Sequence, residues 1–594
     1  MSTLDPAEIH AIIQEYGGNA TQLVQILWKI QDKYTYIPDM ALTTLAQTLN
    51  LSPTHIEGVI SFYSFFNRTP RVYDIFFSDN IIEHMNGKTH LMTLLMQKLG
   101  VEKDKVREDG RVCIRDAACI GMADHPPAAL INGLPVTHLD EAKINQIAMW
   151  IEAQHPISEW DSDYFQVDNH IQKTNILLGL DFENGSAIKA AMNTTAEKVI
   201  AELTAANLRG CGGAGFKLAS KWLLCRNAPG EHYMVCNADE GEPGTFKDRV
   251  LLQSYPDLMI EGMTVGARVI GAKKGFIYLR AEYRYLRPIL ETALQKRREQ
   301  NLLGDNILGD ADFSFDIEIH LGAGAYICGA ETALLESLEG KRGVPRKRPP
   351  PFPVSEGYLQ QPTVVNNVET LSFAAKILAL GAQRFIALGT AQSKGTKLIS
   401  VSGDCAKPGI YEIPFGTTVR KMLEWCEADI DNVQAVQNSG AAGVCLSPEE
   451  FDRQLAFEDI NTTGSFMIFS KERNLLDMIH NFANFFVHES CGFCTPCRVG
   501  TSLLKNYVEK VIAGNATGAD LEEMKHISHL MKTTSHCGLG MTASNYIADT
   551  LTKFPALYEA CLKHQSLTPS FDLDAALEDS RQITHRDDAA AHIG

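Results

Sequence analysis

Three cysteines stand within seven positions of the segment ESCGFCTPCRVG, at Cys491, Cys494 and Cys497. Thiolates spaced in this way on one loop can reach three corners of a cubane iron–sulfur cluster, which needs four ligands. The candidate for the fourth is Cys537, in the glycine-rich segment SHCGLG about two helices further along the chain. Because two intervening helices of an antiparallel bundle would bring that turn back beside the first loop, we predict a 4Fe–4S cluster held by these four residues.

The apolar spacing of RNLLDMIHNFANFFVHES predicts a helix that ends where these cysteines begin. A structural zinc site is the alternative for the same cysteines, although zinc sites more often divide their ligands into two pairs. Four other cysteines stand alone and are interpreted as small buried side chains. They are Cys225, Cys405, Cys426 and Cys561.

Two glycine-rich loops in the middle of the chain have the character of anion-binding turns. LRGCGGAGF places Gly210, Gly212 and Gly215 in the pattern G-x-G-x-x-G, and GAGAYICGAETALLESLEG leads into an expected helix from about Glu331. Glycines let backbone N–H groups approach a phosphate closely, and a helix N-terminus favours the anion. Two such loops suit the phosphate of a nucleotide or a flavin.

Short polar side chains follow two further strand patterns, in the position where ligands lie in open α/β sheets. They could bind the ring edge or the ribityl chain of a flavin. They are Asn237, Asp239 and Glu240 in NADEGEPGTFKDR, and Asn366, Asn367 and Thr370 in VNNVET. A structural turn or a helix cap is the alternative for each motif alone, but four motifs in one region favour a binding site.

The composition excludes several classes of function. The net charge of −18 argues against binding to nucleic acid or to anionic membrane surfaces. No apolar run approaches the ~18 residues of a membrane helix, so we expect no direct membrane insertion. The N-terminal residues MSTLDPAEIH are polar and acidic, unlike a secretory signal. Fourteen cysteines are therefore expected in a reducing compartment, the cytoplasm, as ligands or free thiols.

The order of strand and helix patterns predicts a multidomain α/β protein. The expected units are a helical region at 1–70, a mixed domain at 71–155, a linker at 156–185, an α/β domain at 186–390, a β-rich module at 391–468, a helical region at 469–565 and a poorly ordered tail at 566–594.

The motifs GGAGF, NADEGEPGTFKDR, GAGAYICG, PTVVNNVET and ESCGFCTPCRVG together resemble the NADH-oxidising flavoprotein subunit of respiratory complex I and its soluble relatives, over about residues 190–565. The N-terminal segments LWKIQDKYTYIP and LSPTHIEGVISFYSFF look like the thioredoxin-like partner subunit of the same enzymes. This fusion, and the segment PSFDLDAAL, most resemble the diaphorase flavoprotein (alpha) subunits of cytoplasmic NAD-reducing nickel–iron hydrogenases.

The resemblance implies what each unit is. It implies a thioredoxin-like domain at 71–155, a Rossmann-like FMN- and NADH-binding domain at 186–390, a ubiquitin-like module at 391–468 and a four-helix bundle with the 4Fe–4S cluster at 469–565. It implies FMN, NAD(H) and one 4Fe–4S cluster as cofactors. No catalytic acid–base residue is expected, because the cofactors carry the chemistry.

The resemblance also implies which residues contact the cofactors. FMN would be held by Gly210, Gly212, Gly213, Lys221, Asn237, Asp239, Glu240, Asn366, Asn367 and Thr370. NAD(H) would stack on the flavin near Phe216, Glu331, Arg348 and Phe352, and Gly329 is a further cofactor-binding residue. The cluster would be held by the four cysteines named above.

The thioredoxin-like part departs from its family at the expected metal ligands. That subunit usually holds a 2Fe–2S cluster with C-x4-C and C-x3-C, and these positions fall here on Ser78, Glu83, Cys119 and Ala123. Since one of the four cysteines survives, we predict that this domain carries no 2Fe–2S cluster and serves as a docking scaffold. The alternative recruits Cys113 and Cys119 with oxygen ligands, although thiolates or imidazoles are the norm.

Three smaller departures lie in the cofactor loops. Cys211 replaces the usual arginine, which we interpret as a tolerated neutral substitution. Ala330 replaces the usual acidic residue beside Glu331, and its loss could relax selectivity for NAD over NADP. Arg348 stands where lysine is common, in a cationic run from 346 to 348 that could attract the dinucleotide phosphates or form a solvated surface.

The leading hypothesis is a diaphorase subunit that transfers electrons between NAD(H) and a chain of iron–sulfur clusters through FMN. Its expected partners are an iron–sulfur electron-transfer subunit and nickel–iron hydrogenase subunits. One alternative is the flavoprotein subunit of complex I or of an NAD-dependent formate dehydrogenase. Another is an iron–sulfur scaffold without turnover, against which the intact flavin motifs argue.

Overall fold

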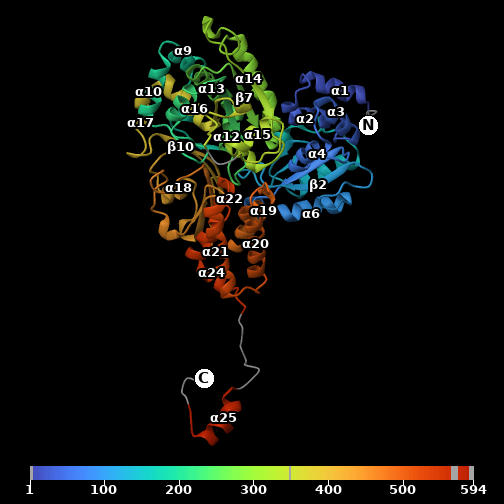
Figure 1. The fold of residues 1–594 in the computed structure, drawn as a ribbon, viewed down its shortest axis with the longest axis vertical. Coiled ribbons are helices and arrows are strands. Elements are labelled where there is room, and N and C mark those ends of the chain that lie inside the picture. Colours follow the sequence, from blue (N-terminus) through green and yellow to red (C-terminus); the bar gives the residue numbers. More distant parts are fainter. Residues whose placement is uncertain (1–4, 347–349, 564–572, 588–594) are drawn as a thin grey trace.

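A computed structural model describes residues 5–346, 350–563 and 573–587 of the chain. It confirms the predicted multidomain α/β fold. In Figure 1 the N-terminal helices and the thioredoxin-like domain lie to one side, the parallel-sheet domain lies at the top, and the helical bundle extends below it. Among the helices of these residues, none combines the length and the apolar character that a membrane crossing requires.

The N-terminal region is helical, as predicted. Its main helices are α1 (Pro6–Glu15), α2 (Leu23–Tyr34), α3 (Asp39–Leu49) and α4 (Pro53–Phe62). Ser52 caps α4 by accepting from the backbone N–H of His55, and Pro53 fills the first helical position, where no N–H is needed. The apolar faces of these helices belong to the same hydrophobic core as the parallel-sheet domain.

The thioredoxin-like domain has a separate core. Its sheet has the order β2-β1-β3-β4, in which β1 is parallel to β2 and antiparallel to β3. The elements are β1 (Tyr73–Ser78), α5 (Ile81–Met85), α6 (Lys88–Leu99), β2 (Val112–Ala117), β3 (Ala129–Ile131), β4 (Leu134–Val136) and α7 (Glu141–Glu152). Helices α6 and α7 pack on each other and contribute to this core.

Residues 156–185, expected to be a linker, contain regular structure. Strand β5 (Ile171–Lys173) pairs in parallel with β11 (Gly409–Pro414). The short helix α8 (Ile176–Gly179) follows, and the buried carboxylate of Glu412 accepts from the N–H groups of Asn175, Leu177 and Leu178 at its start. Sequence periodicity missed this segment because three residues are too few to show a period.

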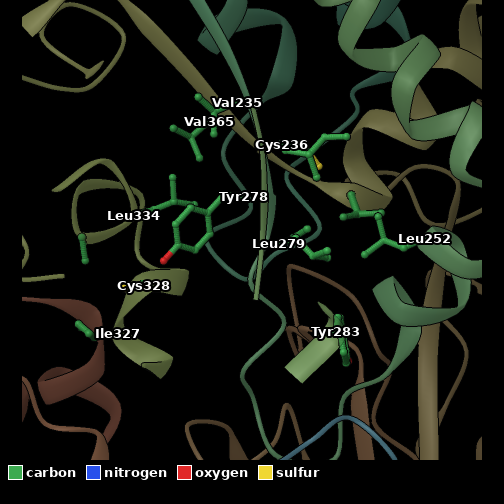
Figure 2. Packing of buried hydrophobic residues seen from close by; sticks show 14 of the residues in the cluster. Val235, Cys236, Leu252, Tyr278, Leu279, Tyr283, Ile327, Cys328, Leu334 and Val365 are labelled. Carbon is green, nitrogen blue, oxygen red and sulfur yellow. The ribbon is translucent and has the colours of Figure 1, made fainter. Parts of the chain in front are cut away.

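A four-stranded, wholly parallel sheet of order β8-β7-β6-β9 forms the Rossmann-like domain. Its strands are β6 (Tyr233–Ala238), β7 (Lys274–Leu279), β8 (Asp316–Leu321) and β9 (Thr363–Asn367). Figure 2 shows buried side chains from three of these strands, Val235, Tyr278 and Val365, together with Leu334. Because every strand runs the same way, the carboxyl ends carry their polar residues to one edge.

Helices α13 (Pro256–Ile270) and α16 (Val368–Leu380) pack closely together and on β6. Their approach requires Gly262, since a Cβ there would lie 2.0 Å from the carbonyl oxygen of Leu371. This contact fixes the start of α16. Of the predicted flavin residues, Thr370 lies in this helix, and Asn366 and Asn367 directly precede it.

The β-rich module has its own core and a six-stranded sheet of order β13-β12-β14-β10-β11-β5. It contains β10 (Thr396–Gly403), β11, α18 (Val419–Trp425), β12 (Val433–Asn438), β13 (Val444–Leu446) and β14 (Ser465–Ser470). Strands β10 and β11 pair in the antiparallel direction, and the chain turns between them at Lys407 and Pro408.

The C-terminal bundle is built from α19 (Leu475–Glu489), α20 (Thr495–Ile512), α21 (Gly518–Thr534) and α23 (Asn545–Lys553), with the short α22 (Gly538–Thr542) between the last two. The tail was expected to be poorly ordered, but it contains helix α25 (Leu573–Thr584). An ion pair of 2.8 Å between Arg581 and Asp574 spans two turns of that helix and stabilises it.

Candidate active site

The structure brings the four candidate cluster cysteines together at the top of the bundle. Cys491 follows the end of α19, Cys494 is the N-cap of α20, Cys497 lies in the first turn of that helix, and Cys537 is the N-cap of α22. All four line one cavity, which Ile327 and other residues complete. The left-handed conformation of Gly492, with φ of 74°, lets the chain turn between the first two cysteines.

The donor set of this cavity fits a 4Fe–4S cluster. All four cysteines are free thiols. Burial raises the pKa of the Cys497 thiol to about 11, so a positively charged metal centre is needed to hold it as a thiolate. The wall is closely packed, because a Cβ on Gly540 would lie 3.0 Å from the Cβ of Cys497. The hydroxyl of Ser490 lies 3.2 Å from the Cys497 sulfur and can donate to it.

The first glycine loop is a closed turn in front of α11 (Leu218–Arg226). The N–H of Gly210 donates to the carbonyl of Phe216 at 2.9 Å, and Gly213 and Gly215 have φ values of 128° and 64° that favour glycine. Helix α11 starts without a side-chain cap, so the positive end of its dipole lies beside the loop. These features suit a phosphate.

Cys211 lies inside this loop and points into the protein. Its backbone N–H donates to the hydroxyl of Thr370 at 2.8 Å, which ties the loop to α16. Burial raises the pKa of the Cys211 thiol to about 12, so the thiol stays neutral and does not repel a phosphate. This geometry agrees with the interpretation of a neutral substitution.

The polar residues after β6 face the second glycine loop. The side-chain amide of Asn237 donates to the carbonyl of Gly329 at 2.8 Å. One carboxyl oxygen of Asp239 is buried with no hydrogen-bond partner among the described residues, and burial raises the pKa of this group well above its usual range. A buried polar atom without a partner is uncommon, and a flavin hydroxyl or ring N–H would satisfy it. The site therefore fits FMN.

Asn366 and Asn367 hydrogen-bond within the protein. The amide oxygen of Asn366 accepts from the indole N–H of Trp222 at 2.9 Å. The amide nitrogen of Asn367 donates to Asp248 at 2.6 Å, and its oxygen caps α16. A Cβ on Gly212 would lie 3.1 Å from the Cβ of Asn367, so these residues form the floor under the first loop.

Glu240 is buried and engaged on three sides. Its carboxylate accepts from the backbone N–H groups of Asp248 and Arg249 at 2.8 and 3.1 Å, at the start of α12 (Lys247–Ser254), and from the hydroxyl of Tyr283 at 2.8 Å. Burial raises the pKa of Glu240 to about 7. These contacts place Glu240 as a support for the loop that carries Asp239.

Of the residues expected near NAD(H), Phe216 and Phe352 are exposed, and Glu331 contacts Lys221, which is expected at the flavin. Lys221 on α11 forms an ion pair with Glu331, the first residue of α15 (Glu331–Leu338), and donates to the carbonyl of Val365 at 2.7 Å. The side chains of Phe216 and Phe352 are 52% and 57% exposed, so both rings are accessible for stacking. Arg348 lies outside the described residues.

The second glycine loop touches both candidate cofactor sites. Gly329 contacts Asn237, while Ile327 lines the cysteine cavity. The backbone N–H of Tyr326 donates to Glu489 at 2.9 Å, which fastens the loop to the end of α19. Sequence reasoning missed Glu489, although its position two residues before the first ligand, Cys491, was a signal. One loop thus joins the flavin side to the cluster side.

Three of the four positions of the usual 2Fe–2S ligands surround the side chain of Asn80. The side-chain amide of Asn80 is 3.2 Å from Ser78, 3.5 Å from Glu83 and 3.4 Å from the sulfur of Cys119. Burial raises the pKa of Glu83 to about 8. Cys113 lies near the start of β2, whereas Cys119 follows its end, so the two are not brought together as the alternative required.

Comparisons with known proteins agree with these geometries. Residues 203–376 match the family described as Nuo51 FMN-binding domain, residues 477–561 match the NADH-ubiquinone oxidoreductase-F iron-sulfur binding region, and residues 9–152 match the family of thioredoxin-like [2Fe-2S] ferredoxins. The fold and the site therefore define a flavin- and iron–sulfur-type oxidoreductase subunit.

The similarity to one group of relatives extends over the whole chain. The NAD-reducing hydrogenase HoxS subunit alpha of Cupriavidus necator is 44% identical, over 96% of this chain and 97% of its own length. A crystal structure of an NAD+-reducing [NiFe]-hydrogenase in the H2-reduced state contains a chain with a TM-score of 0.87 and 42% identity, covering 97% of this chain and 98% of that one. An NADH-quinone oxidoreductase subunit of Aquifex aeolicus is 41% identical over 64% of this chain and 90% of its own length. The chain belongs to the family of the alpha subunits of NAD-reducing hydrogenases.

The comparison corrects one prediction. The match of residues 9–152 to the thioredoxin-like [2Fe-2S] ferredoxins contradicts our prediction that this domain carries no 2Fe–2S cluster. That prediction relied on four ligand positions, whereas the match to the family extends over residues 9–152. At those positions this chain has Ser78, Glu83, Cys119 and Ala123.

Proposed function

We propose that this chain is the diaphorase subunit of an NAD-reducing hydrogenase, which transfers electrons between NAD(H) and iron–sulfur clusters through FMN. The observation that carries the proposal is similarity over nearly the full length of both chains to the Cupriavidus necator alpha subunit. The loop from Gly322 to Glu331 supports it, because this loop contacts both the flavin side and the cysteine cavity.

Each group of residues has a separate role in this proposal. FMN, when bound, supplies the conversion between the paired electrons of a hydride and the single electrons that an iron–sulfur cluster accepts. The first glycine loop and α11 bind its phosphate, and Asp239 and Asn237 orient the rest of it. Phe216 and Phe352 stack with the dinucleotide. Cys491, Cys494, Cys497 and Cys537 ligate the cluster.

We further propose that the partners are an iron–sulfur electron-transfer subunit and the nickel–iron subunits, and that the complex resides in the cytoplasm. The similar chain in a crystal structure entitled NAD+-reducing [NiFe]-hydrogenase supports the choice of partners. The N-terminal region and the thioredoxin-like domain provide a large surface for such an assembly.

The flavoprotein subunit of complex I is the second candidate. The Aquifex aeolicus relative supports it over the flavin and cluster regions. However, that similarity covers 64% of this chain, whereas the hydrogenase similarity covers 96%. The fused N-terminal regions therefore favour the hydrogenase.

Purification of the tagged chain from its own cells, followed by identification of co-purifying subunits, tests the proposal. We expect nickel-containing subunits in the complex, hydrogen-dependent reduction of NAD+, and NADH-dependent reduction of an artificial dye by the isolated chain. Co-purification of quinone-reducing membrane subunits without nickel would favour the second candidate. Failure of the FMN-loaded chain to reduce the dye would contradict both.

A further inference from the structure

Three histidines from separate segments meet beside the thioredoxin-like domain, away from the cysteine cavity. His125 follows β2, His138 follows β4, and His170 directly precedes β5. One ring nitrogen of each lies within 4.8 Å of the corresponding nitrogens of the other two. The rings of His125 and His170 stack with centroids 4.0 Å apart and an interplanar angle of 6°, and the centroid of His138 lies 5.1 Å from that of His125.

The imidazoles of this cluster lack partners that buried rings normally have. His125 is 2% exposed, and neither of its ring nitrogens has a hydrogen-bond partner among the described residues. Nδ1 of His170 is also buried without a partner in the described part of the chain. A neutral imidazole offers one donor and one acceptor, and buried polar atoms are usually satisfied. Unsatisfied ring nitrogens that lie within 4.8 Å of one another therefore point to a missing ligand.

The backbone holds the three residues in place. His138 and His170 have φ values of 48° and 42°, a region that non-glycine residues seldom occupy. The N–H of His138 donates to the carbonyl of His125 at 3.1 Å, and the carbonyl of His170 accepts from Ile410 on β11 at 2.9 Å. The rings are thus brought together by contacts between domains and not by chance rotation of surface side chains.

A buried carboxylate stands behind the cluster. Oδ1 of Asp124 lies 2.9 Å from Nδ1 of His125, and its Oδ2 lies 3.7 Å from Nδ1 of His170, in neither case with the geometry of a hydrogen bond. The second oxygen of Asp124 accepts from Arg249 at 2.8 Å. A carboxylate beside histidine ligands is typical of metal sites.

Two cationic side chains, Arg249 and Lys143, lie near the histidines, and each forms a hydrogen bond with another group. The Arg249 guanidinium is paired with Asp124, and Lys143 donates to the carbonyl of Thr137 at 2.7 Å. Their charges oppose a dication and limit its affinity, but neither blocks the histidine nitrogens by a hydrogen bond that the structure describes.

We propose that His125, His138 and His170 bind one divalent transition-metal ion of the Zn²⁺ class. Three neutral imidazoles suit zinc and its neighbours, whereas Mg²⁺ and Ca²⁺ prefer oxygen ligands. The exposed side chain of His138 leaves room for water as a fourth ligand. The ion ties the thioredoxin-like domain to the segment that enters β5, and through it to the β-rich module.

Metal content of the holoprotein tests this proposal. The full chain with its iron–sulfur cluster and FMN is dialysed against a chelator that leaves iron in place, then equilibrated with Zn²⁺ or Co²⁺ alone. Zinc, cobalt and iron are counted by mass spectrometry, and the visible absorption of Co²⁺ reports its geometry. The variants are His138→Gln and His170→Gln, and the matched control is the exposed His526→Gln on α21.

We expect the wild-type protein and the control to bind one equivalent of Zn²⁺ or Co²⁺. Both cluster variants should lose this ion, while their iron and FMN contents stay unchanged. Zn²⁺ should raise the midpoint of thermal unfolding for the wild-type protein and the control, and not for the variants. Absence of the equivalent from the wild-type protein, or its retention in either variant, would overturn the proposal. His138→Gln alters an exposed side chain, so it serves as the decisive variant if His170→Gln does not fold.

Discussion

The iron–sulfur cage and the flavin site of this molecule are assembled in opposite ways. The proposed cage takes three ligands from the single segment between Cys491 and Cys497, and a fourth from the turn before α22. The flavin residues come from separate segments between Gly210 and Thr370, and several of them already hydrogen-bond to the protein. The cage depends on a metal for its stability, whereas the flavin site is largely organised by the chain itself.

This difference has a physical reason. Buried thiols stabilise one another little, so the stability of the cage depends on the metal that the thiols bind. In the flavin site, Asn366, Asn367 and Glu240 stabilise loop shapes, and the loops then present backbone N–H groups. Removal of one side chain should therefore abolish the cluster, whereas the flavin site should be most sensitive to atoms added to its glycines.

The largest effect is expected for Cys537→Ala. A cubane with three ligands loses its stable coordination, so iron content and the cluster signal in electron paramagnetic resonance should fall to background. Transfer to partner subunits should stop, while dye reduction directly from FMN continues. Cys561→Ala, in the same C-terminal region but outside the cage, should behave like the wild-type protein. A full cluster signal in Cys537→Ala would contradict the assignment.

The second-largest effect is expected at Glu242, whose carboxylate contacts Tyr326 in the second glycine loop. Its carboxylate accepts from the N–H of Ala442 at 2.9 Å and the hydroxyl of Tyr326 at 2.5 Å, and burial raises its pKa from 4.5 to about 7. Because the folded protein holds this proton more tightly than the unfolded chain, stability from Glu242 is present below pH 4.5 and is lost as pH rises toward 7.

The variant Glu242→Gln should remove this pH dependence. Relative to the variant, the wild-type protein should lose about 3 kcal/mol of unfolding free energy across that pH range. Thermal unfolding midpoints measured at closely spaced pH values check this, with the exposed Glu523→Gln as the surface control. Parallel curves for the wild-type protein and Glu242→Gln would count against the inference.

A smaller effect is expected for Gly215→Ala in the first glycine loop. A Cβ at Gly215 would lie 2.7 Å from the ring of Phe457, so the loop must shift, at a cost of roughly 1–3 kcal/mol. FMN affinity, measured by fluorescence titration, should fall about 10-fold or more. Gly271→Ala is the matched control, because Gly271 also has positive φ but no atom within 4 Å of the added Cβ. Equal FMN affinity in both variants would show that the loop shape does not matter.

The smallest effect is expected for Ser490→Ala, which removes a hydroxyl 3.2 Å from the Cys497 sulfur. A hydrogen bond to a ligand sulfur stabilises the reduced cluster. A net loss of about 1 kcal/mol lowers the one-electron potential by roughly 40 mV at constant iron content. A redox titration followed by electron paramagnetic resonance checks this, and an unchanged potential would assign the hydroxyl to packing alone. The matched control is Ser502→Ala on the exposed face of α20, because that hydroxyl donates to the carbonyl of Arg498 and not to a sulfur.

Local patterns in the sequence determined much of this protein. The apolar spacing after Arg473 predicted α19, and the order of strand and helix patterns predicted the α/β domain that holds the four-stranded sheet. The cysteine spacing predicted the cage, including the distant Cys537. These features could be read because helix and strand periods, caps and closely spaced ligands are properties of neighbouring residues.

Only the tertiary structure decided which distant segments meet. It joined β5 to β11, packed the N-terminal helices on the parallel-sheet domain, placed Glu489 against Tyr326, and gathered His125, His138 and His170. It also showed that Glu240 supports a loop. Each of these contacts joins residues far apart in the chain, and their free energy comes from burial and hydrogen bonds that exist after folding, so no local pattern carries them.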